Sequence, residues 1–361
     1  MPSINKFNIQ NFRNIKTVDL LLNENYNIFF GSNGAGKTAI LEAICLLATG
    51  KSFRSYLKSR MITYGCHETT IFIMMNKTKD QYHHKIGLTK TINSKAKLRI
   101  DGQYSRSLAA ATKLLPIVLV DPNSYELIER GPQKRRHYLD WGLFHVEPAF
   151  NTFYSDFKSC LRQRNAAIKA QASKKICQTW DRELIIAAEK ITKMRKDYFQ
   201  KIKPQFEKIL AELHFNISIE SDYYQGWNEK LNLQEQLNNN LAKDITLGYT
   251  SVGPQKADVF YLVNKMPANE VLSRGQMKLM VSTMQFAQGK LYTELTGNRC
   301  IYLIDDLASE LDYANRNKLF KLLESLQGQC FITATDKNVF SHLDSRKTSL
   351  FHVEQGKIIP L

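Results

Sequence analysis

An eight-residue segment of the sequence has the residue types and spacing that bind phosphate groups. It fits the pattern G-x-x-x-x-G-K-[ST] at every fixed position. In such a loop the glycines let backbone N–H groups close around phosphates at the start of a helix, Lys37 supplies a positive charge, and the Thr38 hydroxyl can bind Mg²⁺. The sequence therefore predicts a nucleoside triphosphate site, formed by Gly31, Ser32, Asn33, Gly34, Ala35, Gly36, Lys37 and Thr38.

The segments on either side of this loop have the patterns of a strand and a helix. Residues 26–30 form an apolar run that is typical of a buried strand. Strand, glycine-rich loop and helix in this order are the context that the phosphate-binding motif requires. Up to Gly50, apolar residues recur at helical spacing, namely Ile40, Leu41, Ile44, Leu47 and Ala48.

A pair of adjacent carboxylates follows another apolar segment. Residues 300–304 have the pattern of a buried strand, and Asp305 and Asp306 come directly after it. Parallel strands bring their last residues to the carboxyl edge of the sheet, where ligands bind. We therefore expect Asp305 to contribute to magnesium coordination and Asp306 to orient a water, which is the chemistry of a Walker B segment.

A serine and a glycine stand at the start of a further predicted helix. Ser273, Gly275 and Gln276 precede apolar residues at helical spacing, so their backbone N–H groups are candidates for phosphate binding. The order of motifs along the chain is that of an ABC-type ATPase head: first the P-loop, then the Ser-x-Gly-Gln segment, then the paired aspartates. In that class the signature serine completes the nucleotide site of a partner head. Since each chain has one P-loop and one signature, we expect an ATP-dependent homodimer.

The chain also resembles the RecF family of bacterial recombination and repair proteins along essentially its whole length. Besides the P-loop, the resemblance rests on residues 12–15 (FRNI), 51–55 (KSFRS), 97–102 (KLRIDG), 135–142 (RRHYLDWG), 163–167 (QRNAA), 272–276 (LSRGQ) and 305–312 (DDLASELD). It implies an ATP-bound dimer that clamps DNA near single-strand gaps. It further implies that the dimer works with RecR and RecO to direct recombinase loading in recombinational repair, replication restart and SOS induction.

Two positions depart from the broader ABC pattern. The second Walker B acid is Asp306, where the wider class has glutamate. After the strand at 331–334 the wider class has a histidine, whereas this chain has Thr335 and Asp336. Both departures favour slow hydrolysis. Together with the family resemblance, they lead us to expect a weak, DNA-dependent ATPase that uses ATP mainly as an assembly switch. Gln255 occupies a position where the family usually has histidine, and we assign it no role. Gln133 is the candidate for the Q-loop glutamine.

The charge balance favours an anionic partner. The 361 residues include 50 Lys and Arg against 34 Asp and Glu, a formal net charge of +16. Residues 151–210 hold 14 basic and 6 acidic residues. A solvated basic face is the alternative interpretation. The candidate DNA contacts lie in a short basic segment with aromatic neighbours and are Lys51, Arg54, Lys58 and Arg60.

The six cysteines indicate the redox environment in which the protein folds. They form no C-x-x-C pair, and several lie in apolar segments, as expected for reduced thiols in a cytoplasmic protein. No segment resembles a signal peptide or reaches the length of a membrane span, so we expect no membrane association. We expect no metal site apart from the magnesium that accompanies ATP.

The predicted fold class is α/β, an ABC-type (SMC-like) ATPase head with a mixed β-sheet core and a helical insertion lobe. Residues 1–140 would form the N-terminal part of the head, 141–248 the helical lobe, and 249–361 the C-terminal part with signature and Walker B. Apolar stripes on 150–161 and 184–202 predict two packed helices in the lobe. Two alternatives remain: a transporter-type ABC subunit, and a DNA-binding module with a vestigial ATPase.

Overall fold

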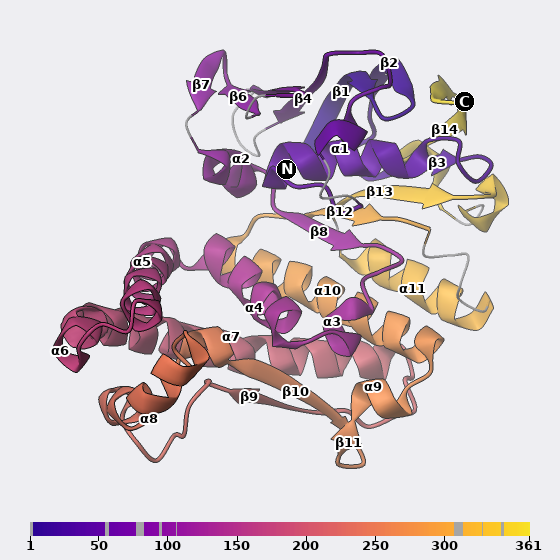
Figure 1. The fold of residues 1–361 in the computed structure, drawn as a ribbon. Helices are drawn as coiled ribbons and strands as arrows, with labels where there is room; N and C mark the ends of the chain where they lie inside the picture. The colour runs from indigo at the N-terminus through magenta and orange to yellow at the C-terminus, as the bar shows by residue number, and fades with distance from the viewer. Residues whose placement is uncertain are drawn as a thin grey trace. The chain divides into compact units, whose positions relative to one another are not determined.

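A computed structural model of the chain describes residues 3–54, 58–76, 83–93, 96–105, 107–306, 313–326, 328–340 and 343–361. The chain divides into two compact units, which we describe separately. Unit 1 comprises Met1–Ser124 and Gln288–Leu361, and unit 2 comprises Tyr125–Ala287. Figure 1 labels the helices and strands of both.

Unit 1 contains an antiparallel sheet with the strand order β2-β1-β4-β5-β6-β7. The hairpin between β6 and β7 turns at Asp101 and Gly102, which both have positive φ. The strands are β1 (Ser3–Phe12), β2 (Ile15–Leu21), β4 (Glu68–Asn76), β5 (His83–Thr91), β6 (Lys97–Ile100) and β7 (Gln103–Ser105).

The second sheet of unit 1 is mostly parallel and has the order β15-β14-β3-β13-β12-β8. Its strands are β3 (Tyr26–Phe30), β8 (Ile117–Val120), β12 (Ile301–Ile304), β13 (Gln329–Ala334), β14 (Thr348–Glu354) and β15 (Lys357–Pro360). All neighbouring pairs are parallel except β14 and the edge strand β15. The predicted strands before the P-loop and before Asp305 are therefore both in this sheet, and their carboxyl ends share one edge.

Helix α1 (Lys37–Thr49) contacts strands of both sheets. Eleven of its thirteen residues are buried, which explains why it is apolar on nearly all sides. The helix ends where predicted, because Gly50 adopts the left-handed conformation of a C-cap at φ 69°. Figure 1 shows α1 between the two sheets. The other helical elements of this unit are α2 (Leu108–Leu114), α11 (Tyr313–Ser325), η1 (Lys58–Met61), η5 (Lys337–Phe340) and η6 (Ser345–Lys347).

Unit 2 is mainly helical. The two predicted stripes lie on α5 and α7, which pack against each other, and the α7 stripe from Leu184 to Ile202 is buried. The aromatic stripe of α5 is buried at Phe150 and Phe157, so it serves as core packing. The helical elements are α3 (Glu126–Glu129), α4 (Pro132–Val146), α5 (Phe150–Lys169), α6 (Lys174–Cys177), η2 (Gln178–Trp180), α7 (Asp181–Glu212), α8 (Leu233–Leu247), η3 (Pro254–Lys256) and α9 (Ala268–Val271).

A separate three-stranded sheet of unit 2 differs from the sequence-based expectation. It joins β9 (Glu220–Tyr224), β10 (Asp258–Val263) and β11 (Met266–Pro267) in the order β11-β10-β9. We had expected the β10 segment to belong with the strands of the head. Strand β10 pairs with β9 and β11 and with no described strand of unit 1. The compact units divide after Ser124 and Ala287, whereas the expected boundaries are at 140 and 248. Helix α10 (Arg274–Thr296) begins in unit 2 and ends in unit 1.

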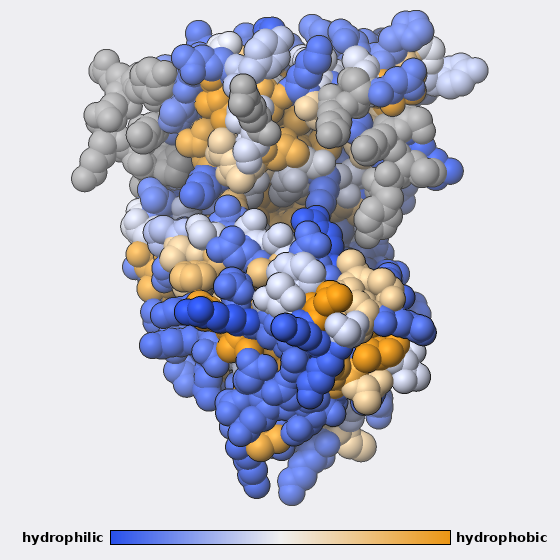
Figure 2. All heavy atoms as spheres, turned by 60° about the vertical axis from the view of Figure 1, so that its left-hand side comes forward, coloured by the Kyte–Doolittle hydropathy of each residue, from blue (hydrophilic) through white to orange (hydrophobic). Residues whose placement is uncertain are grey.

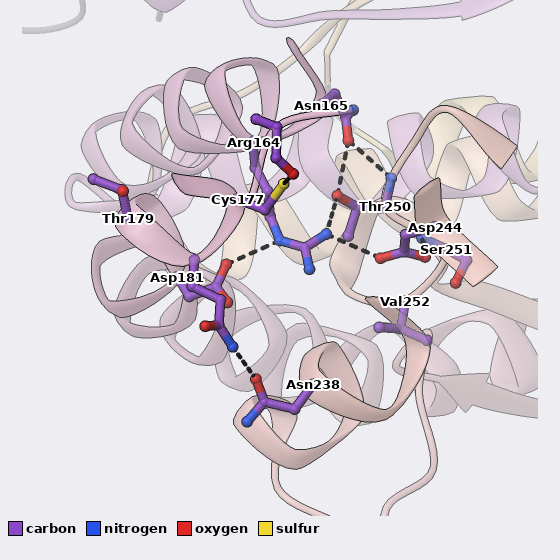
Figure 3. A network of polar contacts seen from close by, with 12 residues as sticks. Arg164, Asn165, Cys177, Thr179, Asp181, Asn238, Asp244, Thr250, Ser251 and Val252 are labelled. Atoms are coloured by element: carbon purple, nitrogen blue, oxygen red, sulfur yellow. Dashed lines mark hydrogen bonds and ion pairs between the residues drawn. The ribbon is translucent and has the colours of Figure 1, made fainter. Parts of the chain in front are cut away.

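A fully buried arginine of α5 links its own helix to three other segments of unit 2, as Figure 3 shows. Arg164 on α5 donates from Nε to Asp181 Oδ1 and from Nη1 to Asp244 Oδ2, both at 2.9 Å. Its Nη1 also donates to Thr250 Oγ1 at 2.7 Å. Helices α5, α7 and α8 and the segment that follows α8 are therefore held around one guanidinium group.

On the face shown in Figure 2 hydrophilic residues predominate, and hydrophobic residues form only small patches.

Candidate nucleotide-binding site

The P-loop leaves β3 and enters α1 through three glycines with positive φ. The angle is 150° at Gly31, 80° at Gly34 and 118° at Gly36. A Cβ at Gly31 would lie 2.2 Å from the carbonyl oxygen of Val353, and one at Gly36 would lie 2.9 Å from the side-chain amide of Asn14. Backbone conformation therefore favours glycine at both positions, and at Gly31 the Val353 backbone also leaves no space for a side chain.

The ammonium group of Lys37 lies over its own loop. Nζ donates hydrogen bonds to the carbonyl oxygens of Gly31 at 2.6 Å and Ser32 at 2.9 Å. Burial lowers the pKa of Lys37, while the negative charges of Asp306 and Asp305 act in the opposite direction. The loop thus holds a positive charge at the position where P-loop proteins bind phosphate.

Asp305 is the carboxylate that meets the P-loop. Its Oδ1 accepts hydrogen bonds from Thr38 Oγ1 at 2.9 Å and from Thr333 Oγ1 at 2.7 Å, and its N–H donates to the carbonyl oxygen of Val120 at 2.8 Å. Burial raises the pKa of Asp305, and the bonds from Thr333 and Thr38 oppose that rise. A hydroxyl and a carboxylate held this close are hard oxygen donors, the type that Mg²⁺ prefers, so these residues fit a magnesium ion.

The second predicted acid, Asp306, turns sharply away from β12. Its φ is 50°, in the left-handed region, and its N–H donates to Thr333 Oγ1 at 2.9 Å. The side chain is half-buried. Both aspartates therefore stand at the carboxyl edge of the parallel sheet, as the sequence pattern indicated. The remainder of the DDLASELD segment, residues 307–312, lies outside the described residues.

The signature segment lies in unit 2 and is exposed. Ser273 caps helix α10, because its Oγ accepts from the N–H of Gln276 at 3.3 Å while Gln276 Oε1 accepts from the N–H of Ser273 at 2.9 Å. This reciprocal pair is a capping box. Ser273, Arg274 and Gly275 are exposed, and a Cβ at Gly275 would meet nothing within 4 Å. The start of the helix is thus open to a molecule that approaches from outside the unit.

The predicted basic segment is tied to the P-loop helix by Arg13. The guanidinium of Arg13 forms two bonds with the carboxylate of Glu42 in α1 and donates from Nη1 to the carbonyl oxygen of Arg60 at 2.6 Å. Glu42 also accepts from Ser52 Oγ. These contacts fix both ends of the segment beside α1. Of the four predicted DNA contacts, Lys51, Arg54 and Arg60 are exposed, and the side chain of Lys58 is not among those described.

The charge of Arg54 reaches the nucleotide site. Burial raises the pKa of Asp305, and the positive charge of Arg54 is the smallest of the effects that oppose this rise. The backbone N–H of Arg54 donates to Ser52 Oγ at 3.0 Å, which holds the segment in a turn. A residue that we had assigned only to DNA therefore lies within electrostatic reach of the Walker B carboxylate.

Two polar residues at the site were not predicted individually. Asn14 donates from Nδ2 to the carbonyl oxygen of Ala35 at 3.0 Å and so braces the P-loop from outside. Thr333 contacts both Asp305 and Asp306. Asn14 lies in the FRNI segment and Thr333 in the strand before Thr335, but neither segment reveals these long-range bonds.

The two glutamines with open roles lie in unit 2. Gln133 is exposed in the first turn of α4. Gln255 donates from Nε2 to the carbonyl oxygens of Val252 at 2.8 Å and Thr250 at 3.2 Å, so it stabilises its own loop.

Among the described residues, no helix is long and apolar enough to cross a membrane.

Comparison with known proteins extends these observations to the whole chain. The family described as RecF/RecN/SMC N terminal domain matches residues 3–359. The DNA replication and repair protein RecF of Vibrio vulnificus (strain CMCP6) is 40% identical over 358 residues, which cover 99% of each chain. RecF of Vibrio cholerae serotype O1 (strain ATCC 39541) is 39% identical over 361 residues, again with 99% of each chain covered.

Solved structures agree with the sequence relatives. A structure described as the recombination mediator protein RecF-ATP in the RecFOR pathway superposes with a TM-score of 0.87 at 26% identity and covers 100% of this chain and 98% of that chain. An Smc head bound to the C-winged helix domain of ScpA has a TM-score of 0.63 at 16% identity, which shows the fold alone. The expected SMC-like ATPase head fold is therefore confirmed, and the chain belongs to the RecF family of DNA replication and repair proteins.

Proposed function

We propose that this chain binds ATP with Mg²⁺ and uses it to assemble a homodimer on DNA during recombinational repair. The observation that carries the proposal is the 2.9 Å hydrogen bond between Thr38 Oγ1 of the P-loop helix and Asp305 Oδ1 of the Walker B segment. Membership of the RecF family supports the proposal. The solved structure described as RecF-ATP, which has the same fold as this chain, supports it as well.

In this proposal the P-loop from Gly31 to Thr38 binds the phosphates, and Lys37 is placed against the terminal ones. Thr38 and Asp305 would hold the magnesium ion, which when bound would neutralise charge on the phosphate oxygens. Asp306 would orient the attacking water. Its carboxylate is one methylene shorter than the glutamate of the wider class, which supports slow hydrolysis. We propose that DNA stimulates this hydrolysis.

The proposed dimer follows from the signature segment. The chain has one P-loop and one signature, and the signature residues Ser273 and Gly275 are exposed and free to approach a second copy. With Gln276 they would complete the nucleotide site of the partner subunit. ATP would then act as the bridge between two heads, and its hydrolysis would release them.

DNA binding is supported by the formal charge of +16 and by the exposed basic side chains of Lys51, Arg54 and Arg60. Lys58 belongs to the same segment. We propose that the ATP-bound dimer binds DNA at single-strand gaps or junctions with duplex. RecR and RecO would be its partners in recombinase loading, with roles in replication restart and SOS induction.

The two alternatives are less well supported. A transporter-type ABC subunit is disfavoured by the RecF family match, which covers residues 3–359. A DNA-binding module with a vestigial ATPase is disfavoured because Lys37, Thr38 and Asp305 are all present and brought together within unit 1.

Sedimentation velocity with ATP, with ADP and with gapped DNA tests the proposal. We expect a monomer with ADP, a dimer with ATP, and a dimer bound to DNA when ATP and DNA are both present. A protein that stays monomeric with ATP, or that dimerises equally with ADP and without nucleotide, would contradict the assembly switch.

A further inference from the structure

The strand next to Walker B carries a threonine that touches both aspartates. Thr333 lies on β13 and is 1% exposed. In the parallel pair of β12 and β13, Ile304 is opposite Ile332, so Thr333 lies beside the first residue after β12, which is Asp305. Strand β13 thus extends past the end of β12 and places a buried hydroxyl beside the two carboxylates.

The hydroxyl of Thr333 uses both of its hydrogen-bonding capacities. The hydroxyl donates a hydrogen bond to Asp305 Oδ1 at 2.7 Å, and its oxygen accepts one from the N–H of Asp306 at 2.9 Å. A threonine hydroxyl has one donor, so its orientation is set once Asp305 is its acceptor. The lone pairs then point toward other donors, of which the Asp306 N–H is one. Thr333 therefore fixes a side chain and a backbone group at once.

The bond to Asp306 matters because of the backbone conformation there. At φ 50° Asp306 adopts a left-handed conformation that is unfavourable for most residues with a side chain. With this conformation the chain leaves the direction of strand β12, which ends at Ile304. Asp306 is half-buried, and an N–H shielded from water without an acceptor would add a further cost to this conformation. The Thr333 hydroxyl supplies that acceptor.

We propose that Thr333 is a positioning residue for the Walker B pair, which holds Asp305 toward Thr38 and fixes the turn that aims Asp306. The inference rests on the proposed ATPase function. It also assigns a role to the strand that precedes Thr335, the position where the wider class has a histidine. The Thr333 hydroxyl contacts Asp305 and Asp306, so its effect on the nucleotide site would be exerted through them.

The test compares Thr333→Val, which keeps the branched shape but removes the hydroxyl, with Thr333→Ser, which restores it. The matched control is Thr69→Val in the same unit, because Thr69 is also buried on a strand and its hydroxyl donates to the carbonyl oxygen of Gln10 at 2.8 Å. We expect Thr333→Val to lower kcat for ATP by roughly 10-fold to 100-fold, with a much smaller change in KM. Thr333→Ser and Thr69→Val should remain close to the parental protein.

A second readout needs neither nucleotide nor activity. Amide hydrogen exchange in the ATP-free protein should show a protected N–H at Asp306, and Thr333→Val should speed its exchange while Thr333→Ser preserves it. An unprotected Asp306 amide in the parental protein would overturn the inference even if the Val variant did not fold. Equal kcat values for Thr333→Val and the parental protein would overturn it as well. Failure of the parental protein to bind ATP would instead contradict the proposed function, and the exchange measurement would still decide the role of Thr333.

Discussion

Arg13 and Glu42 form a bidentate ion pair between the β1–β2 turn and the P-loop helix α1. Nε lies 2.9 Å from Oε2 and Nη2 lies 2.6 Å from Oε1. The Glu42 side chain is 0% exposed, so the pair compensates a charge buried inside the unit. Through the Arg13 bond to Arg60 and the Ser52 bond to Glu42, the same pair ties the basic segment to the helix that begins at Lys37. The candidate DNA contacts and the candidate nucleotide site therefore share one support.

Replacing Arg54, Lys58 and Arg60 together by alanine should weaken DNA binding. Each lost phosphate contact should reduce the slope of log affinity against log salt by roughly 0.7 to 0.9. Binding isotherms at several salt concentrations measure this slope. The control replaces three exposed lysines of unit 1 elsewhere, Lys16, Lys97 and Lys357. If both triple variants kept the parental affinity and slope, the segment would be an ordinary solvated face.

Lys37→Met should abolish ATP turnover and ATP-dependent dimerisation. The methionine fills similar space but removes the ammonium group that lies against Gly31 and Ser32, and with it the only fixed cation of the loop. ATP affinity by calorimetry and dimer content by sedimentation are the two measurements. A matched control is Lys16→Met, an exposed lysine of β2 to which no nucleotide or DNA contact is assigned. Unchanged dimerisation of Lys37→Met would refute the role of this loop.

Arg164→Met should strongly destabilise unit 2. The substitution leaves Asp181 and Asp244 buried without their shared cation, and breaking a buried pair in this way costs about 3–5 kcal/mol of unfolding free energy. Urea unfolding of the whole chain gives the value. Arg162→Met, an exposed arginine on the same helix, should change stability by no more than about 0.5 kcal/mol. Equal losses in the two variants would mean that the network contributes nothing specific.

The same network predicts an unusual pH dependence. Burial raises the pKa of Asp181 above its ordinary value of 3.8, and Asp244 adds to the rise, while Arg164 only partly offsets it. The folded protein therefore holds this proton more tightly than the unfolded chain, so Asp181 lowers stability as the pH rises above 3.8. Asp181→Asn removes that loss, and its stability relative to the parental protein should improve from pH 4 toward pH 7. Asp156→Asn, an exposed carboxylate on α5, is the control, and parallel curves for Asp181→Asn and the parental protein would contradict the assignment.

Local patterns were enough to predict the elements that carry the site. The apolar run at 26–30, the glycines and the helical stripe up to Gly50 correspond to β3, the P-loop and α1. The run before Asp305 is β12. These segments could be predicted because each has the periodicity of its own structure and a clear end signal.

Partners that are distant in sequence could not be predicted in this way. The apolar pattern of β10 shows that it is a strand, but not that it pairs with β9 in place of the head strands. Likewise, nothing in the sequence around Asn14 or Thr333 shows that one braces Ala35 and the other bonds to Asp305. Such contacts depend on which strands become neighbours, and that follows from the packing of the whole unit.

The central claim is that two copies share each nucleotide site, and ATP turnover by a mixture of two variants tests it most directly. Ser273→Arg places a bulky cation where the signature serine would approach the partner's phosphate, and Lys37→Met disables the P-loop. In a mixed dimer both lesions fall in one composite site, while the other site keeps an intact Lys37 and an intact Ser273. We expect each variant alone to be inactive and the mixture to recover partial turnover. Full turnover by Ser273→Arg alone, or no recovery in mixtures where sedimentation demonstrates mixed dimers, would contradict the shared site.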